Sequence, residues 1–150
     1  SLIEKGVTII DQKEIQNYGQ QSIGILLFQG IGDDYFGCGG YIDICHGAKK
    51  IVFVGSFTAK GLDVINDSNG IKIKNEGTIK KAVKSVDEIT YSPKMQKESG
   101  QEIRIITERC VFSIENNRVT LIEIANGVDL KEDILDQMDF RPQISENLRL

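Results

Sequence analysis

The stretch GCGGYIDI (Gly37–Ile44), followed closely by KKIVFVG (Lys49–Gly55), decides the fold. Three glycines within four residues allow a sharp turn and a close approach of the backbone to a ligand. The run Ile42–Ala48 is long enough for two helical turns, and Ile51–Val54 is an unbroken β-branched and aromatic run typical of a buried strand. A glycine loop that opens a short helix presents free backbone N–H groups, which suit an oxyanion or a phosphate. On pattern alone, a tight turn without a ligand is the alternative.

The composition predicts a single globular domain spanning residues 1–150. Of its 150 residues, 40% are hydrophobic and 27% are charged, which is enough to bury a core. The net charge of −4 argues against nucleic acid as a partner, because phosphate binding requires a basic surface. We expect no membrane contact, since no apolar run approaches the roughly 20 residues of a span. Ser1–Lys5 is no signal peptide and lacks an initiator methionine, so we expect a processed chain or one cut from a longer protein.

The cysteines indicate a reducing compartment. Cys38, Cys45 and Cys110 are an odd number at unrelated spacings, which fits neither a disulfide framework nor a zinc site. We therefore expect a cytoplasmic protein without a metal. Cys38 and Cys110 lack a neighbouring histidine or basic cluster, so they are interpreted as inert small hydrophobic residues.

Apolar and alternating runs predict a strand-rich fold. Strands are expected at Val7–Ile10, Ile23–Phe28, Ile51–Phe57, Leu62–Ile65, Ile71–Lys74, the second half of the ambiguous run Ile79–Tyr91, Glu102–Ile114 and Val119–Ile124. The Asn69-Gly70 turn makes the fourth and fifth runs a hairpin, and residues 115–118 join the last two in a second hairpin.

Helices are expected between these runs. Pro93 starts a polar helical turn that ends near Gly100. Asp129 can cap a helix over Leu130–Met138, and Pro142 prevents its continuation. The fold class predicted is α/β, an open mixed sheet with flanking helices.

Several other residues have both a functional and a simpler interpretation. His46 suits acid–base catalysis, but it has no evident nucleophile and carboxylate around it, so a partly exposed helix-end histidine is the simpler reading. Asp33-Asp34 is either a cation site or a solvated loop. The dinucleotide fingerprint fails, because Tyr35 occupies the position of its third glycine.

Basic residues are the remaining candidates. Lys60 precedes a glycine at the end of the predicted strand Ile51–Phe57, and residues at strand ends of open α/β sheets often face ligands. Glu108-Arg109 falls within a strand pattern, so a charge pair at the sheet edge is expected. The other lysines are either phosphate contacts or, more simply, a solvated face. They are Lys49, Lys50, Lys72, Lys74, Lys80, Lys81 and Lys84.

The segment GCGGYIDICHGAKKIVFVGSFTAKGL (Gly37–Leu62) strongly resembles the family I coenzyme A transferases, in particular their single-chain acyl-CoA:acetate or propionate branch. The resemblance covers roughly residues 36–150, whereas residues 1–35 match poorly. Its further blocks are Glu76-Gly77, Ile89–Ser92, Gly100–Glu102, Ile106–Phe112, Leu121–Ala125, Gly127–Leu130, Asp133–Leu135, Met138 and Phe140–Pro142. These blocks match the C-terminal end of a much longer enzyme.

The resemblance implies an enzyme of short-chain fatty acid and ketone body metabolism that moves coenzyme A between carboxylic acids. Its substrates are an acyl-CoA thioester and a short-chain carboxylate, with no permanently bound cofactor. A glutamate attacks the thioester and becomes a glutamyl-CoA thioester. Glycine-loop amides hold the thioester oxygen, which implies CoA-binding roles for Gly39 and Gly40, with Gly37 shaping the turn. We add Lys60 to this set.

The attacking glutamate is expected outside this chain. In the family it lies in a Glu-(Ser/Asn)-Gly motif well upstream of the glycine loop, and Glu4 and Glu14 have the wrong neighbours. Glu98-Ser99-Gly100 spells the motif, but it lies in a polar surface turn and is interpreted as structural. Alone, the chain is therefore expected to be inactive and to need the missing N-terminal segment or subunit. The alternative is a non-catalytic remnant or CoA-binding module. An open apolar sheet edge also predicts a homo-oligomer.

Overall fold

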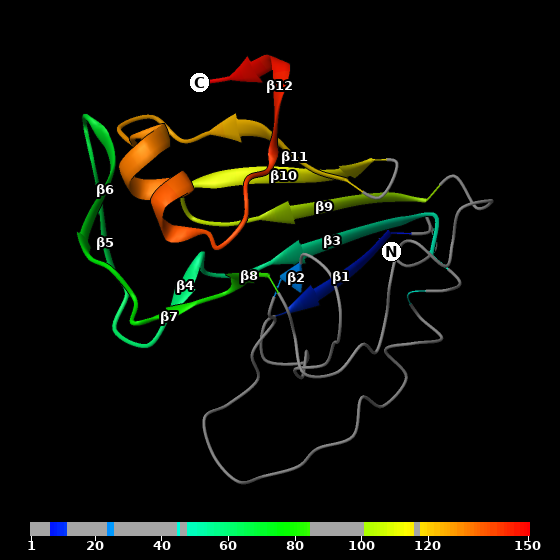
Figure 1. The fold of residues 1–150 in the computed structure, drawn as a ribbon, viewed down its shortest axis with the longest axis horizontal. Coiled ribbons are helices and arrows are strands. Elements are labelled where there is room, and N and C mark those ends of the chain that lie inside the picture. The colour runs from blue at the N-terminus through cyan, green and yellow to red at the C-terminus, as the bar shows by residue number, and fades with distance from the viewer. Residues whose placement is uncertain (1–6, 12–23, 26–44, 46–47, 85–100, 116–117) are drawn as a thin grey trace, which may run out of the picture.

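The computed structural model describes residues 7–11, 24–25, 45, 48–84, 101–115 and 118–150. A six-stranded sheet with the order β1-β3-β9-β10-β11-β12 forms its centre (Figure 1). Its strands are β1 (Val7–Asp11), β3 (Lys50–Val54), β9 (Glu102–Ile106), β10 (Cys110–Glu115), β11 (Arg118–Ile124) and β12 (Gln143–Arg149). Neighbouring strands are parallel except at β10, which is antiparallel to both β9 and β11. The predicted mixed sheet is confirmed.

Five strands of this sheet end at one edge. Because β1, β3, β9, β11 and β12 run in the same direction, their carboxyl ends lie together, on the side of Figure 1 to which the arrowheads of β3 and β9 point. We call this side the carboxyl edge. The segments that follow β3, β9 and β11 therefore meet there, which is where ligands bind in open α/β sheets.

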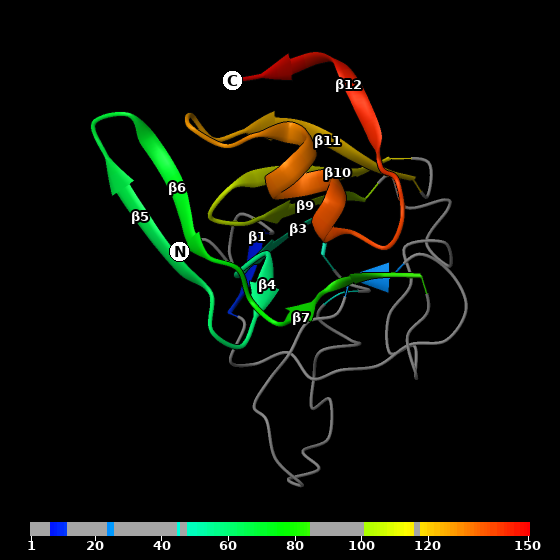
Figure 2. The ribbon, with the colours of Figure 1, turned by 60° about the vertical axis from the view of Figure 1, so that its left-hand side comes forward.

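Short strand pairs flank the sheet. β4 (Thr58–Ala59) pairs with β7 (Ile79–Lys80), and β2 (Gly24–Ile25) pairs with β8 (Ala82–Val83). β5 (Asp63–Asp67) and β6 (Gly70–Asn75) form the hairpin that the sequence predicted, and it projects from the sheet in both ribbon views (Figure 2).

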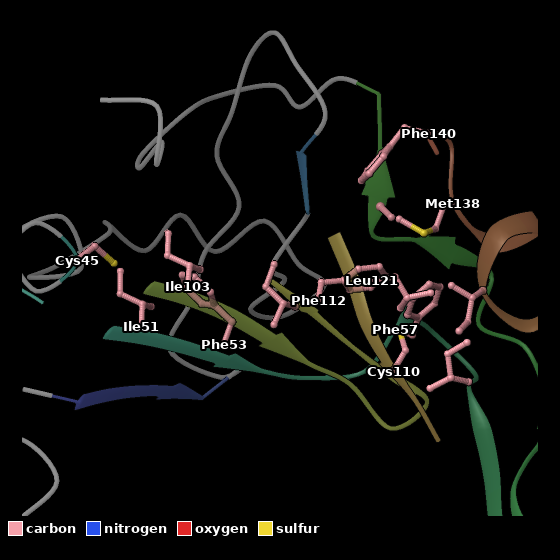
Figure 3. Close-up of a cluster of buried hydrophobic side chains, with 14 residues drawn as sticks. Cys45, Ile51, Phe53, Phe57, Ile103, Cys110, Phe112, Leu121, Met138 and Phe140 are labelled. Atoms are coloured by element: carbon pink, nitrogen blue, oxygen red, sulfur yellow. The ribbon is translucent and has the colours of Figure 1, made fainter. Parts of the chain in front are cut away.

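The core lies on one face of the sheet. Alternate residues of β3 and β9 point into it: Ile51 and Phe53 of β3, and Ile103 and Ile105 of β9. Figure 3 shows this row extending from Cys45 towards the aromatic and aliphatic side chains at the carboxyl edge. The core members at that end are Phe57, Cys110, Phe112, Leu121, Met138 and Phe140.

Two predicted strands end earlier than expected. The predicted strand Ile51–Phe57 stops at Val54, and Gly55–Phe57 belong to the loop that follows β3. The predicted strand Glu102–Ile114 is wrong as a single element, because residues 107–109 turn the chain between the antiparallel strands β9 and β10. The Thr107 side chain closes this turn. Its hydroxyl donates a hydrogen bond to the Cys110 carbonyl and accepts one from the Cys110 N–H.

The last helix forms as two short turns. η2 (Leu130–Ile134) is a π-helical turn and η3 (Leu135–Gln137) a 3₁₀ turn, followed by the strand β12, which the sequence did not predict. The predicted cap is confirmed, since the Asp129 carboxylate accepts from the Glu132 N–H at 2.7 Å. Ile134 and Met138 are buried in the core. No helix among the described residues is long and apolar enough to cross a membrane.

Replacing Asp129 with alanine is expected to lower the free energy of unfolding by about 1 kcal/mol, because the Glu132 N–H loses its acceptor at a helix start. Urea denaturation followed by circular dichroism measures this change. Asp63→Ala is the control: it removes an exposed carboxylate whose ion pair with Lys74 contributes little. Equal losses for the two variants would contradict the capping role.

Four predicted elements are only partly described or lie outside the described residues. Of the predicted helical turns over Ile42–Ala48, the structure describes Cys45, which is helical, and Ala48. Of the predicted strand Ile23–Phe28, the structure describes Gly24–Ile25 as β2. The run Ile79–Tyr91 begins with β7 and β8, and its second half lies outside the described residues, as does the predicted helical turn from Pro93 to Gly100.

Candidate functional site

A buried arginine organises the carboxyl edge. Arg109 lies in the turn between β9 and β10 with its side chain 0% exposed. Its guanidinium forms a bidentate pair with Glu76, with Nη1–Oε2 at 2.7 Å and Nη2–Oε1 at 3.1 Å. Nε donates to Glu108 Oε1 at 2.6 Å, and Nη1 also donates to the Asp133 carbonyl at 2.8 Å. We call Glu76, Glu108 and Arg109 the Arg109 cluster.

The Arg109 cluster fixes the loop that follows β3. Glu108 Oε2 accepts from the Phe57 N–H at 2.8 Å, and the Thr58 hydroxyl donates to Glu76. The Arg109 guanidinium also lies over the Phe57 ring, 4.7 Å from its centroid. Burial by itself raises the pKa of Glu76, but the hydrogen bonds from Arg109 and Thr58 outweigh it and hold that pKa below its ordinary value. The cluster is therefore charged and internally satisfied.

A small cavity lies beside this loop. Its volume is about 30 Å³, and Phe53, Phe57, Ile105 and Phe112 are among the residues that line it. Ser56 after β3, Lys81 between β7 and β8, and Thr107 after β9 also line it, but the cavity surface is almost entirely apolar. We call it the Lys81 cavity.

Lys81 is a buried amine. It is 3% exposed, and its Nζ donates to Ser56 Oγ at 2.9 Å. Burial lowers the pKa of Lys81 to about 8, against an opposing attraction to the Glu108 carboxylate. The prediction of a solvated face is therefore wrong for Lys81, although it describes Lys50, Lys74 and Lys80, which pair with acidic residues at the surface.

The buried amine is expected to make stability pH-dependent. Its folded pKa lies below its unfolded pKa, so between about pH 8 and 10.5 the unfolded chain binds more protons and stability rises with pH. The rise attributable to Lys81 is roughly 3 kcal/mol, and Lys81→Met should lack it. Urea unfolding of both proteins across this range measures the difference. Lys80→Met is the control and should keep the rise; parallel curves for wild type and Lys81→Met would contradict the burial penalty.

The glycine loop is not part of the described structure. Gly37, Gly39 and Gly40 lie outside the described residues, as do Cys38, His46, Asp33-Asp34 and Glu98–Gly100. Their roles stay predictions.

Lys60 lies on the surface in the turn after β4. Its φ is +62°, a left-handed conformation uncommon for a residue with a side chain. Its carbonyl accepts from the Thr78 N–H at 3.0 Å, which ties the turn to the segment before β7. It lies six positions beyond the end of β3 and is not among the residues lining the Lys81 cavity.

The expected charge pair at Glu108-Arg109 exists, but its setting differs from the prediction. The two residues form a turn instead of lying in a strand, and the arginine is buried instead of lying at a sheet edge. Cys110 is a buried free thiol, and burial raises its pKa to about 12, in agreement with an inert residue. Among the described residues, no group of His, Cys, Asp or Glu side chains is placed to hold a metal ion.

Sequence reasoning missed the Lys81 cavity. Lys81 follows another lysine and precedes Ala82-Val83, so nothing local separates it from its exposed neighbour Lys80. Its partner Ser56 lies 25 positions away.

The fold is an α/β domain whose strand ends meet at one edge, the place where open α/β sheets bind ligands. No protein-family model matches the chain. Its relatives include the caffeate CoA-transferase of Acetobacterium woodii, which is 45% identical over 143 residues, or 95% of this chain and 27% of the relative. The acetate CoA-transferase YdiF of Escherichia coli K12 is 43% identical over 137 residues, or 91% of this chain and 25% of the relative.

A solved structure of a CoA transferase also matches this chain. The acyl-CoA transferase YdiF apoenzyme of E. coli O157:H7 superposes with a TM-score of 0.82 and 38% identity, covering 97% of this chain and 27% of that one. Its thioester complex with CoA superposes equally well. The chain belongs to the coenzyme A transferase family and corresponds to the C-terminal part of these proteins, so the predicted family is confirmed. It spans about a quarter of the length of the relatives it matches.

Proposed function

We propose that this chain supplies the thioester-binding part of an enzyme that transfers coenzyme A between short-chain carboxylic acids. The observation that carries the proposal is the 45% identity over 143 residues to a CoA-transferase. The similarity to the YdiF thioester complex with CoA supports the same chemistry. Coenzyme A enters as a substrate, and the reaction uses no permanently bound cofactor.

The proposed reaction uses a glutamate carboxylate that lies outside this chain. The carboxylate attacks the acyl-CoA carbonyl and expels CoA thiolate, which leaves an acyl-glutamyl anhydride. The thiolate then attacks the glutamyl carbonyl, releases the first acid and leaves a glutamyl-CoA thioester. A second carboxylate reverses these steps and departs as the new acyl-CoA.

The contribution of this chain is electrostatic. Backbone N–H groups at Gly39 and Gly40, in a turn shaped by Gly37, stabilise the negative charge that develops on the thioester oxygen. Lys60 contacts the coenzyme A moiety. The strand β3 follows the glycine loop in sequence and ends at the carboxyl edge, where α/β sheets bind their ligands.

A chimeric enzyme tests this proposal. This chain replaces the matching C-terminal quarter of E. coli YdiF, to which it is 43% identical. The chimera is expected to transfer CoA from acetyl-CoA to propionate, while the isolated chain is inactive. Mass spectrometry after borohydride trapping should find the adduct on a YdiF glutamate. A soluble, inactive chimera that still binds CoA would favour the non-catalytic CoA-binding alternative, and an adduct on Glu98 of the isolated chain would contradict a nucleophile encoded elsewhere.

The same proposal includes the partners and the compartment. We assign the protein to the cytoplasm, supported by the free thiols Cys45 and Cys110. It associates with an N-terminal CoA-transferase segment or subunit and forms a homo-oligomer through its open sheet. A monodisperse monomer in light scattering at high concentration would contradict the oligomer.

A further inference from the structure

One side-chain amide holds the segment that leads into β3. Gln101 immediately precedes β9, and its Nε2 donates to the Cys45 carbonyl and to the Ala48 carbonyl, each at 2.6 Å. Because both neighbours are carbonyl oxygens, the NH2 end of the amide faces them and both of its N–H groups are used. The two carbonyls lie 56 and 53 positions from Gln101 in the sequence, so the amide joins two distant segments.

The two carbonyls belong to the predicted helical turns Ile42–Ala48, in which Cys45 is helical. The last four carbonyls of a helix have no partner within it and need donors from elsewhere. In the predicted turns these are the carbonyls of residues 45–48, and Gln101 donates to the first and the last of them. The amide therefore caps the carboxyl end of these turns from the start of β9.

Backbone pairing and the core support the same anchor. The Glu102 N–H donates to the Lys49 carbonyl at 2.9 Å, and β3 and β9 pair in parallel from Lys50 and Glu102 onward. The Cys45 side chain is 0% exposed, and Figure 3 shows it at the end of the row of core residues, next to Ile51. The end of the predicted turns is thus held by a side-chain amide, by the sheet and by a buried thiol.

The anchored segment follows the predicted glycine loop closely in sequence. Cys45 lies five positions after Gly40 and six after Gly39, which is less than two helical turns. Because so short a segment connects them, a shift of Cys45 is expected to move the N–H groups of these glycines. Donors that stabilise a developing negative charge must be correctly placed, and a displacement of about 1 Å can cost about 100-fold in rate.

We propose that Gln101 is a positioning residue of the transferase reaction. By holding the Cys45 and Ala48 carbonyls against the start of β9, its amide keeps the N–H groups of Gly39 and Gly40 where they stabilise the thioester oxygen. Gln101 acts through this loop and not by contact with the substrate. The inference rests on the proposed function, because it concerns the glycine loop of that same reaction.

Thiol labelling of the 150-residue chain tests the anchor without catalysis. Reaction with iodoacetamide is followed at each cysteine by peptide mass spectrometry, with the buried Cys110 as internal reference. Gln101→Met keeps the side-chain length but removes both donors, so Cys45 should react about tenfold faster than in wild type while Cys110 keeps its rate. Gln143→Met, at an exposed position of β12, is the control and should match wild type. An unchanged rate at Cys45, or the same acceleration at both cysteines, would refute a local anchor.

Single-turnover kinetics of the YdiF chimera test the effect on the reaction. The rate constant for formation of the glutamyl-CoA adduct at saturating acetyl-CoA is independent of how much enzyme is folded, because the active fraction appears in the amplitude. Gln101→Met should lower this rate constant about 10- to 100-fold and leave the KM for acetyl-CoA within about twofold, since the loop donors act on charge that develops in the transition state. Gln143→Met should behave as wild type.

Two further variants test whether the hydrogen-bond donors of Gln101 carry the effect. Gln101→Glu has the same shape but presents only acceptors when ionised, so it should be at least as slow as Gln101→Met. Gln101→Lys supplies N–H donors at a similar reach and should recover part of the rate. An active chimera in which Gln101→Met keeps the wild-type rate constant, or in which Gln101→Glu is faster than Gln101→Lys, refutes the inference alone. An inactive wild-type chimera refutes the proposed function on which the inference rests.

Discussion

The Arg109→Met variant is expected to lose about 3–5 kcal/mol of stability, the largest effect of any single substitution considered for this protein. The substitution keeps the length of the side chain but removes its charge, so Glu76 and Glu108 lose their shared partner in a site where Arg109 is 0% exposed. The Asp133 carbonyl also loses its donor. Because small domains are stable by only about 5–15 kcal/mol, the variant should be close to unfolding at room temperature.

Urea denaturation monitored by circular dichroism measures this loss. The matched control is Arg141→Met, which removes a surface arginine whose side chain is 65% exposed and lies 3.9 Å from Asp136. The control should change stability by less than about 0.5 kcal/mol. Arg109→Lys should remain destabilised, because lysine cannot form the bidentate contact with Glu76. An Arg109→Met protein as stable as the control would show that the cluster contributes nothing to the fold.

The second large effect is expected for Gly70→Ala at the tip of the β5–β6 hairpin. Gly70 has a φ of +108°, and a β-carbon there would lie 2.1 Å from the Asn126 carbonyl oxygen, a backbone atom that cannot rotate away. The Ile71 N–H donates to the same carbonyl at 2.7 Å, so the hairpin would have to separate from the turn after β11. We expect a loss of about 2–5 kcal/mol, the sum of backbone strain and overpacking.

Gly61→Ala separates these two causes. Gly61 has a similar φ of +91°, but a β-carbon there would meet only the Asn75 side chain at 3.7 Å. The loss of stability in Gly61→Ala should come from the backbone strain alone, about 1–2 kcal/mol. Thermal or urea unfolding of both variants gives the steric contribution as their difference. If the two glycines were equally sensitive, the contact between the hairpin and the turn after β11 would be unimportant.

Local patterns in the sequence predicted local structure correctly. The Asn69-Gly70 hairpin and the Asp129 cap were found because each depends on residues within a few positions of one another. The glycine loop and its following blocks indicated the coenzyme A transferase family, which the relatives confirm.

The long-range contacts of the candidate site were not readable in the same way. Arg109 and Glu76 are 33 positions apart, and the Phe57 N–H and Glu108 are 51 apart. A single sequence does not indicate which distant charges meet, so the turn at residues 107–109 was taken for a strand and Lys81 for a surface lysine. Pairing of this kind is decided by the packing of the whole sheet.

The wide sequence separation within the Arg109 cluster also has a kinetic consequence. Contacts between distant segments close long loops, and the entropy of closing those loops is lost before the contacts stabilise the chain. The cluster joins the segments after β3, β6 and β9 to η2. We therefore expect the contacts of Arg109 to be absent from the folding transition state, so that their loss accelerates unfolding much more than it slows folding. The half-life of the native chain, more than its rate of formation, would then depend on this one guanidinium.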